Sequence, residues 1–155
     1  MAPLFNYVYA LVTKTQQNTD MTKRSLVVKK STLPKSGKGL FTKASISKGE
    51  LVVEYRGKIT TWKHILANKV FNGYVFYVNR NHVVDAMKNM KALGRYANDA
   101  KGLSKIKGIR NNADYVVRQG KVYIHATANI RAGDEIFVNY GKEYWDIIMY
   151  NKRIA

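Results

Sequence analysis

Two short stretches hold residues that could contact a ligand. In "SGKGLF", two glycines flank Lys38, and glycine lets a backbone approach a ligand closely, although a tight turn gives the same pattern. In "GRYANDA", Asn98 and Asp99 are polar side chains in a stretch without periodicity, which also suits a turn. Each stretch alone leaves a ligand site and a plain turn open.

A third stretch, "GDEIFVNYGKEYW", contains groups that could take part in catalysis. Asp134 and Glu135 stand side by side and lead into an apolar run that closes on Tyr140. The pattern fits a β-strand with a polar entrance. It equally fits the end of an active site in which the tyrosine hydroxyl takes part, with the two acids shaping the turn and the start of the strand.

Other reaction types find no support in the spacing of the residues. No Ser–His–Asp arrangement and no pair of catalytic carboxylates stands out. The chain has no cysteine, which excludes disulfides, thiolate nucleophiles and zinc–cysteine sites. Three histidines are scattered without metal-ligand spacing, so no metal site is predicted: His64, His82 and His125.

Taken in order, the stretches resemble the motif series of the SET domain, a β-rich family of lysine methyltransferases. The series is "SGKGLF", "EYRG", "GYVFYV", "VDA", "GRYANDA", "NNADYV" and "GDEIFVNYG", and it spans about residues 25–145. The chain looks most like compact, virus-like or single-domain members that lack zinc-binding flanking modules. The resemblance implies a mostly β fold with short helices, the SET-domain β-clip, in which the Asn98 and Tyr140 segments form a pseudoknot.

The resemblance implies a protein-lysine N-methyltransferase that uses S-adenosylmethionine, releases S-adenosylhomocysteine and needs no metal. Tyr140 matches the catalytic tyrosine. Tyr55 and Tyr74 match tyrosines that line the channel for the substrate lysine. Val138 stands at the position that tunes channel volume, so we expect room for more than one methyl group.

The resemblance also implies a set of cofactor-binding residues. Backbone around Lys38 and Gly39 would hold the amino-acid end of the cofactor, Asn98 its amino group, and position 99 its adenine. Tyr144 and Trp145 would cover the cofactor or the channel, or else pack beneath the last helix. The full set is Lys38, Gly39, Leu40, Arg95, Tyr96, Asn98, Asp99, Tyr144 and Trp145.

Three positions depart from the family pattern. Asp99 replaces the usual histidine, and Asn139 replaces the acid before the tyrosine. Asn112 matches the asparagine of the family's Pro-Asn pair, but Asn111 stands where the proline is usual. The departures keep an alternative open: a SET-like module with weak catalysis that binds chromatin or nucleic acid.

The charge of the chain points to an acidic partner. Lys and Arg number 27 against 10 Asp and Glu, a formal charge of +17. Such a charge favours a polyanion, nucleic acid first, although a solvated basic surface would also account for it. The resemblance implies a protein substrate with a basic, histone-like lysine tail, and we expect DNA contact through a basic cluster. The expected place of action is the nucleus or chromatin in a eukaryotic cell or host, and otherwise the inside of the cell. The cluster is Lys101, Lys105, Lys107 and Arg110.

The elements that must position these residues are mostly strands. We expect an N-terminal extension at residues 1–24, the SET domain at 25–145 and a C-terminal helix or tail at 146–155. The apolar run within residues 1–24 is too short to span a membrane, so no membrane partner is expected. Strands are expected at 25–30, 40–43 (after a loop over 31–39), 50–55, 73–79, 81–86, 113–128 (a hairpin turning at Gln119–Gly120) and 134–140. Helices are expected within 60–71, capped by Thr60 or Thr61 and with Trp62, Ile65 and Leu66 on one face, and again over 142–152.

Overall fold

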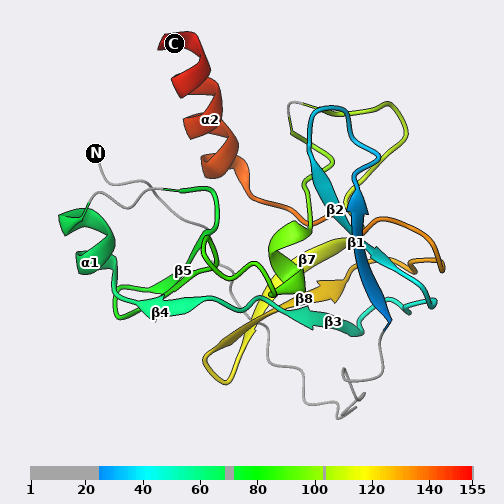
Figure 1. Ribbon diagram of the computed structural model, residues 1–155, viewed down its shortest axis with the longest axis horizontal. Coiled ribbons are helices and arrows are strands. Elements are labelled where there is room, and N and C mark those ends of the chain that lie inside the picture. Colours follow the sequence, from blue (N-terminus) through cyan, green and yellow to red (C-terminus); the bar gives the residue numbers. More distant parts are fainter. Residues whose placement is uncertain (1–24, 69–71, 103, 155) are drawn as a thin grey trace.

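The structure, a computed structural model, describes residues 25–68, 72–102 and 104–154 and is mostly β with short helices (Figure 1). The N-terminal extension predicted for residues 1–24 lies outside the described residues. The strands form three small antiparallel sheets, in the orders β1-β2, β3-β8-β7 and β4-β6-β5. Their bounds are β1 Leu26–Lys30, β2 Lys38–Thr42, β3 Leu51–Glu54, β4 Lys58–Thr60, β5 Val75–Asn79, β6 His82–Asp85, β7 Ala113–Arg118 and β8 Lys121–Ala126.

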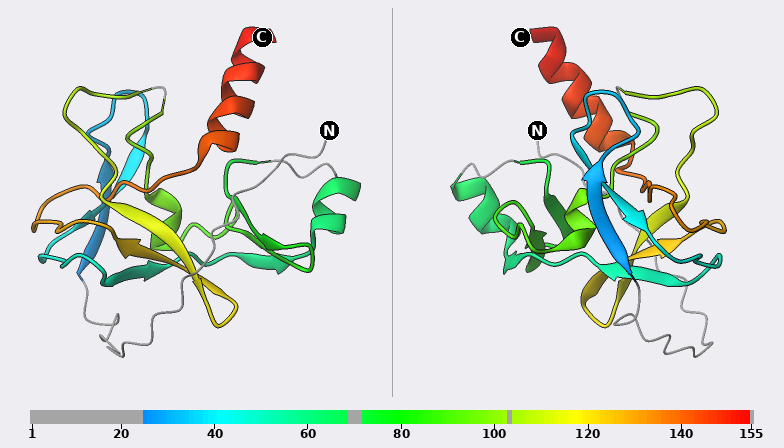
Figure 2. Two further views of the ribbon diagram at one scale, coloured as in Figure 1. Left: turned by 180° about the vertical axis from the view of Figure 1, so that it is seen from behind. Right: turned by 45° about the vertical axis from the view of Figure 1, so that its right-hand side comes forward.

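The three sheets lie next to one another across the molecule (Figures 1 and 2). The β4-β6-β5 sheet and α1 (Trp62–Ala67) lie at one end, the β1-β2 pair at the other, and the β3-β8-β7 sheet between them. One main core joins them, because side chains from β2, β3, β6, β7 and β8 are buried against one another. The final helix, α2 (Lys142–Ile154), projects away from the sheets.

Both predicted hairpins are confirmed. β7 and β8 pair from Ala113 with Ala126 to Arg118 with Lys121, and the two turn residues between them have positive φ, 49° at Gln119 and 74° at Gly120. A two-residue turn of that kind matches the right-handed twist of the strands. The hairpin of β5 and β6 likewise turns between Asn79 and His82.

The predicted last strand, residues 134–140, is wrong as a strand. Among the described residues this segment forms only isolated bridges, from Glu135 to Phe41 and from Phe137 to Asn98. The reason is that its backbone changes partner at successive residues: the Ile136 amide donates to the Leu40 carbonyl and the Val138 amide to the Asn98 carbonyl. A segment threaded between two others cannot build a continuous ladder with either.

Two more expectations need correction. Gly39 does not end a loop; it lies inside β2, paired with Lys29, because the strand begins at Lys38. The short strand β4 and the 3-10 helix η2 (Leu93–Tyr96) were not predicted.

The first predicted helix is shorter than its sequence pattern. Thr61 caps α1 as expected, its hydroxyl accepting from the His64 amide at 3.2 Å. Ile65 is buried, but Leu66 is 43% exposed, so the predicted shared face of Trp62, Ile65 and Leu66 does not hold. A helix of six residues is too short to bury both Ile65 and its neighbour Leu66 against the core.

Candidate active site

Tyr140 lies where the two threaded segments meet. Its backbone amide donates to Asp99 Oδ2 at 2.9 Å, and its hydroxyl donates to the Ala97 carbonyl at 2.7 Å. Burial raises the pKa of Tyr140, so the side chain is a neutral phenol at any physiological pH. Both ends of the residue are therefore tied to residues 97–99.

Residues 97–99 and 136–140 run side by side, as the predicted pseudoknot requires. Asn98 and Phe137 form a parallel bridge, and the Val138 amide donates to the Asn98 carbonyl at 2.8 Å. Asn112 fastens the crossing, since its amide nitrogen donates to the Glu135 carbonyl at 2.8 Å and its side-chain oxygen accepts from the Phe137 amide at 2.9 Å. The crossing brings Asn98 and Tyr140 together although 41 residues separate them along the chain.

The glycine-rich stretch lies against the same crossing. The Asn98 side-chain amide donates to the Lys38 carbonyl at 3.0 Å. Gly39 leaves no room for a side chain, because a Cβ there would lie 2.1 Å from Glu135 Oε1. Leu40 is fully buried in the core, so only its backbone faces this region. Lys38, Gly39 and Asn98 are thus in one place, as predicted.

Glu135 has a larger structural part than the turn-shaping one expected from the sequence. It is 4% exposed and its carboxylate accepts from the Ser31 hydroxyl at 2.7 Å, the Thr32 amide at 2.7 Å and the Thr32 hydroxyl at 2.6 Å. The Asn98 amide adds a fourth contact at 3.3 Å. Its neighbour Asp134 does shape the turn, accepting from the Arg131 amide.

Tyr144 and Trp145 form an aromatic cluster with Tyr140 at the start of α2. The Trp145 ring stacks on Tyr140 with 5.9 Å between centroids and 17° between planes, while Tyr144 meets Tyr140 edge-on at 4.8 Å. The indole lies against the backbone of Gly102, where a Cβ would come within 2.1 Å of it. Both rings are half-buried, so part of the surface of each stays accessible.

The predicted channel tyrosines lie next to each other, and Tyr55 belongs to a second aromatic group. The Tyr55 hydroxyl donates to the Tyr74 carbonyl at 2.9 Å, and burial raises the pKa of Tyr55. The sequence reasoning missed two members: Tyr115 meets Tyr55 edge-on at 5.5 Å, and Phe76 lies 5.0 Å from Tyr115. Their places on the alternating strands β5 and β7 are the signal that could have indicated them. Val138 is fully buried beside this core.

Arg95 and Tyr96 lie toward the channel tyrosines. The Arg95 guanidinium lies 4.2 Å from the Tyr74 ring centroid and 5.1 Å from that of Tyr96, and it donates to the Met87 carbonyl at 3.0 Å. Arg95 is 9% exposed, and its Nε has no partner among the described residues. The cofactor role assigned to both residues from the sequence stays a prediction.

The three departures from the expected pattern each have a local partner. Asn139 accepts from the Gly141 amide at 3.1 Å and so shapes the turn into α2. Asp99 faces inward at 5% exposure, and Asn111 donates to it at 2.8 Å. The side chain at position 99 is therefore occupied within the protein, which leaves its backbone for any ligand contact.

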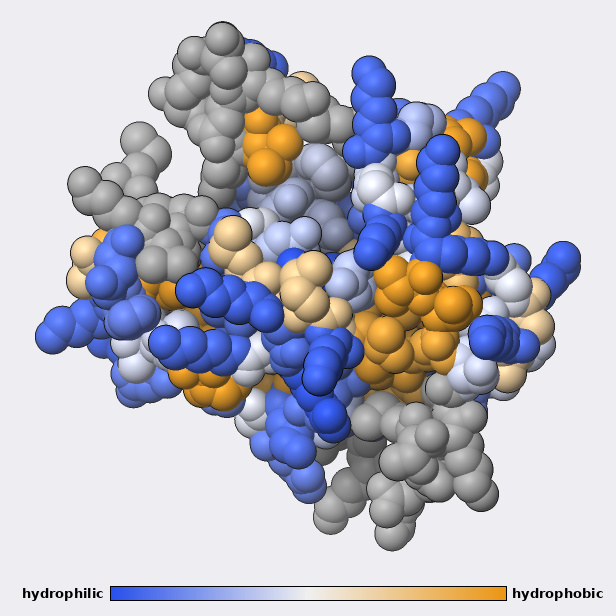
Figure 3. Space-filling view, in the orientation of Figure 1, coloured by the Kyte–Doolittle hydropathy of each residue, from blue (hydrophilic) through white to orange (hydrophobic). Residues whose placement is uncertain are grey.

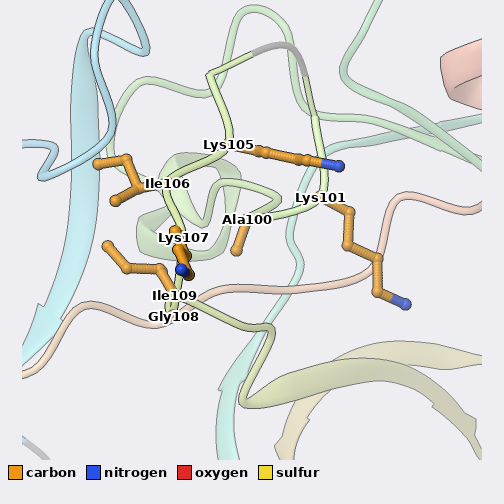
Figure 4. Close-up of a pocket in the computed structure, with 7 residues that line it drawn as sticks. All are labelled: Ala100, Lys101, Lys105, Ile106, Lys107, Gly108 and Ile109. Carbon is orange, nitrogen blue, oxygen red and sulfur yellow. The ribbon is translucent and has the colours of Figure 1, made fainter.

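The described residues of 100–110, the basic loop, border this region. The loop surrounds an open cavity of about 620 Å³, lined by Lys101, Lys105 and Lys107 together with Ile106 and Ile109. In Figure 4 the Lys101 and Lys105 side chains extend to one side, toward α2, and the two isoleucines to the other. Figure 3 shows hydrophilic side chains spread over much of this face. No carboxylate of the described residues forms a salt bridge with the cations of the loop.

No three His, Asp or Glu side chains within the described ranges lie close enough together to hold a metal ion. No helix in the described part of the chain has the length and apolar character to cross a membrane.

Comparison with known proteins gives a consistent result. A family model described as "SET domain" matches residues 37–141. The chain is 29% identical over 136 residues to the histone-lysine N-methyltransferase EZH2 of Chaetomium thermophilum, covering 78% of this chain and 8% of that protein. Two solved structures each match with a TM-score of 0.61 and 27% identity. One is a humanized mutant of the Chaetomium thermophilum Polycomb Repressive Complex 2 bound to the inhibitor GSK126, and the other is an active polycomb repressive complex 2 in the basal state. Each match covers 77% of this chain and 15% of the solved chain, so this chain spans a small part of its relatives.

Proposed function

Because the chain belongs to the SET domain family, we propose that it is a protein-lysine N-methyltransferase that transfers a methyl group from S-adenosylmethionine to a lysine side chain. The observation that carries the proposal is the meeting of Tyr140 with residues 97–99, beside the Lys38 carbonyl and under two aromatic rings. Histone or another basic chromatin protein is the proposed substrate, supported by the similarity to a histone-lysine N-methyltransferase. Nucleus or chromatin is the corresponding place of action.

The residues present fit such a cofactor. The Lys38 carbonyl can accept from its amino group, and Gly39 lets the Glu135 carboxylate, which contacts Asn98, lie directly against β2. The half-buried rings of Tyr144 and Trp145 offer aromatic surface for its adenosyl part. When bound, the cofactor would supply a methyl group on a positively charged sulfur.

The channel residues would prepare the lysine. An amine attacks only when neutral, and a free lysine titrates near about 10.4. Tyr55, Tyr115 and Phe76 form an aromatic wall that would take the amine out of water and lower its pKa. The same rings accept the methylated, cationic product through cation–π attraction.

Tyr140 would orient the reacting groups. Its neutral hydroxyl is held by the Ala97 carbonyl, so its oxygen keeps lone pairs in a fixed direction. Such an oxygen can align the amine and contact the polarised methyl group, which is an orientation effect and requires no general base on the protein.

DNA is the proposed second partner, through the basic loop. Three of its lysines line one open cavity and carry no salt bridge to a described carboxylate, so their charge is available to phosphates. Docking on DNA would place a strongly basic protein next to a basic histone tail, which the charge of the protein alone would repel.

The experiment is a label-transfer assay. The wild-type protein is incubated with S-adenosylmethionine carrying a labelled methyl group and with histones or nucleosomes, and the product is mapped by mass spectrometry. We expect labelled lysine with the wild type and about a hundredfold lower rate with Tyr140→Phe, the size of loss that misplacement of the reacting groups can produce. Tyr123→Phe, which removes a hydroxyl from β8, is the control. Equal labelling by both variants would contradict the role of Tyr140, and no calorimetric binding of S-adenosylmethionine would favour the non-catalytic chromatin reader.

A further inference from the structure

Asp99 and Asn111, two of the departures from the family pattern, bind each other. Asn111 Nδ2 donates to Asp99 Oδ1 at 2.8 Å, and Asn111 Oδ1 accepts from the Ala100 amide at 2.8 Å. The second bond sets which end of the Asn111 amide faces Asp99. A proline at position 111 could make neither bond, so the two replacements work as a pair.

The two oxygens of Asp99 face different parts of the protein. Oδ1 accepts from the Lys101 amide at 2.8 Å, near the start of the basic loop, and from Asn111, the residue that follows its end. Oδ2 accepts from the Tyr140 amide at 2.9 Å and from the Trp145 indole at 2.8 Å. With four donors, the carboxylate has its acceptor positions filled.

Only a carboxylate can accept on both sides. An asparagine at position 99 would present its oxygen to one side and its NH₂ to two N–H groups on the other. A histidine, the usual residue of the family, has a single acceptor nitrogen. Because the site is 5% exposed, water cannot readily replace the missing acceptor.

The indole of Trp145 makes a second link between the same parts. Its six-membered ring lies against Gly102 of the basic loop, and the indole stacks on Tyr140. A shift of the loop must therefore displace either the indole or the hydrogen bonds that hold it.

We propose that Asp99 is a positioning residue that joins the basic loop to Tyr140 and Trp145, so that the conformation of the loop determines the position of the catalytic tyrosine. The effect on the reaction rests on the proposed function; the link between the loop and Trp145 does not.

The test uses Trp145 as a fluorescent reporter. The chain has two tryptophans, and Trp62→Phe in α1 keeps an aromatic contact with Tyr77 while leaving Trp145 alone to emit. In that background, Asn111→Ala and Asp99→Asn are compared with two controls. Lys107→Ala lies in the loop without a hydrogen bond to Asp99, and Asp114→Asn removes a different half-buried carboxylate.

We expect iodide quenching of Trp145 to rise about twofold or more in Asn111→Ala, although Asn111 does not hydrogen-bond the indole, and to stay unchanged in both controls. In Asp99→Asn, kcat should fall about tenfold with the KM for a histone peptide nearly unchanged, as for loss of one charge-assisted hydrogen bond. Unchanged quenching in Asn111→Ala, or an equal rise in Lys107→Ala, would overturn the proposal. Asn111→Ala keeps the test valid if Asp99→Asn does not fold, because three donors to the carboxylate remain. Absence of methyl transfer by the wild-type protein would refute the proposed function, while iodide quenching of Trp145 would still test the link between the basic loop and Trp145.

Discussion

Gly39 provides a sharp test of how the site is built. A Cβ at this position would lie 2.1 Å from Glu135 Oε1 and 2.7 Å from its Cδ, far inside contact distance. The Glu135 side chain cannot simply swing away, because three hydrogen bonds to Ser31 and Thr32 hold it in a buried place. Gly39→Ala must therefore displace either the carboxylate or β2.

Both outcomes carry a cost that can be gauged. Overpacking a well-packed site costs about 1–3 kcal/mol, and each buried donor left without an acceptor costs about 1–3 kcal/mol. We expect Gly39→Ala to lower the free energy of unfolding by about 2–4 kcal/mol, or the melting temperature by roughly 5–15 °C. Under the proposed function, affinity for S-adenosylmethionine should fall as well, because the Asn98 amide lies between Glu135 and the Lys38 carbonyl.

The matched control is Gly37→Ala, two residues earlier. Gly37 has φ +68° and open space around it, so alanine there meets backbone strain of about 1–2 kcal/mol but no clash. Urea denaturation of both variants, followed by circular dichroism, measures the difference, and calorimetry measures cofactor binding. In a Glu135→Ala background, Gly39→Ala should cost little more, since the carboxylate is gone.

The reasoning would be refuted if Gly39→Ala were as stable as Gly37→Ala. It would also be refuted if the two substitutions at positions 39 and 135 proved simply additive. Either result would mean that the backbone of β2 yields easily and that Glu135 does not hold it in place.

Three further predictions concern pH, salt and product. Burial lowers the pKa of His125, so the unfolded chain binds a proton at this residue more readily than the folded protein does. The free energy of unfolding should therefore keep its full value above about pH 6.5 and fall as the pH drops below it. His125→Gln should make the urea midpoints measured between about pH 7 and 5.5 depend less on pH, and an unchanged pH dependence would contradict the effect of burial. The affinity of the protein for nucleosomal DNA should fall steeply as the salt concentration rises. Replacing the four cations of the basic loop by Gln should reduce the slope of log K against log salt by about 3–4, whereas a wild-type affinity that does not change with salt would exclude the DNA contact. The channel beside Val138 should admit more than one methyl group, and mass spectrometry showing only monomethyllysine at saturation would contradict this.

Much of the local structure follows from short stretches of sequence. Gln119–Gly120 between two β-rich runs predicts the β7-β8 hairpin, because the turn residues themselves adopt the positive φ that the turn requires. Thr61 predicts the start of α1 by the same kind of local hydrogen bond. The ordered series of stretches from "SGKGLF" to "GDEIFVNYG" resembles the SET domain, and that resemblance implies the fold and the pairing of the Asn98 and Tyr140 segments.

The sequence could not show which way the side chains in the crossing face. Glu135 and Asp134 are adjacent acids, yet one is buried under Gly39 and the other shapes an exposed turn. Arg95 shares a stretch with Asn98, yet its guanidinium lies on Tyr74.

The sequence by itself determined the hairpins, the helix cap and the family of this protein, because these depend on residues a few positions apart or on the order of whole stretches. Only the tertiary structure decided the roles of Glu135, Asp99 and Arg95 and the absence of a ladder in residues 134–140. The partners of Asp99 that matter most, Tyr140 and Trp145, are 41 and 46 residues away along the chain. Contacts of that kind exist only once the two segments have been threaded together.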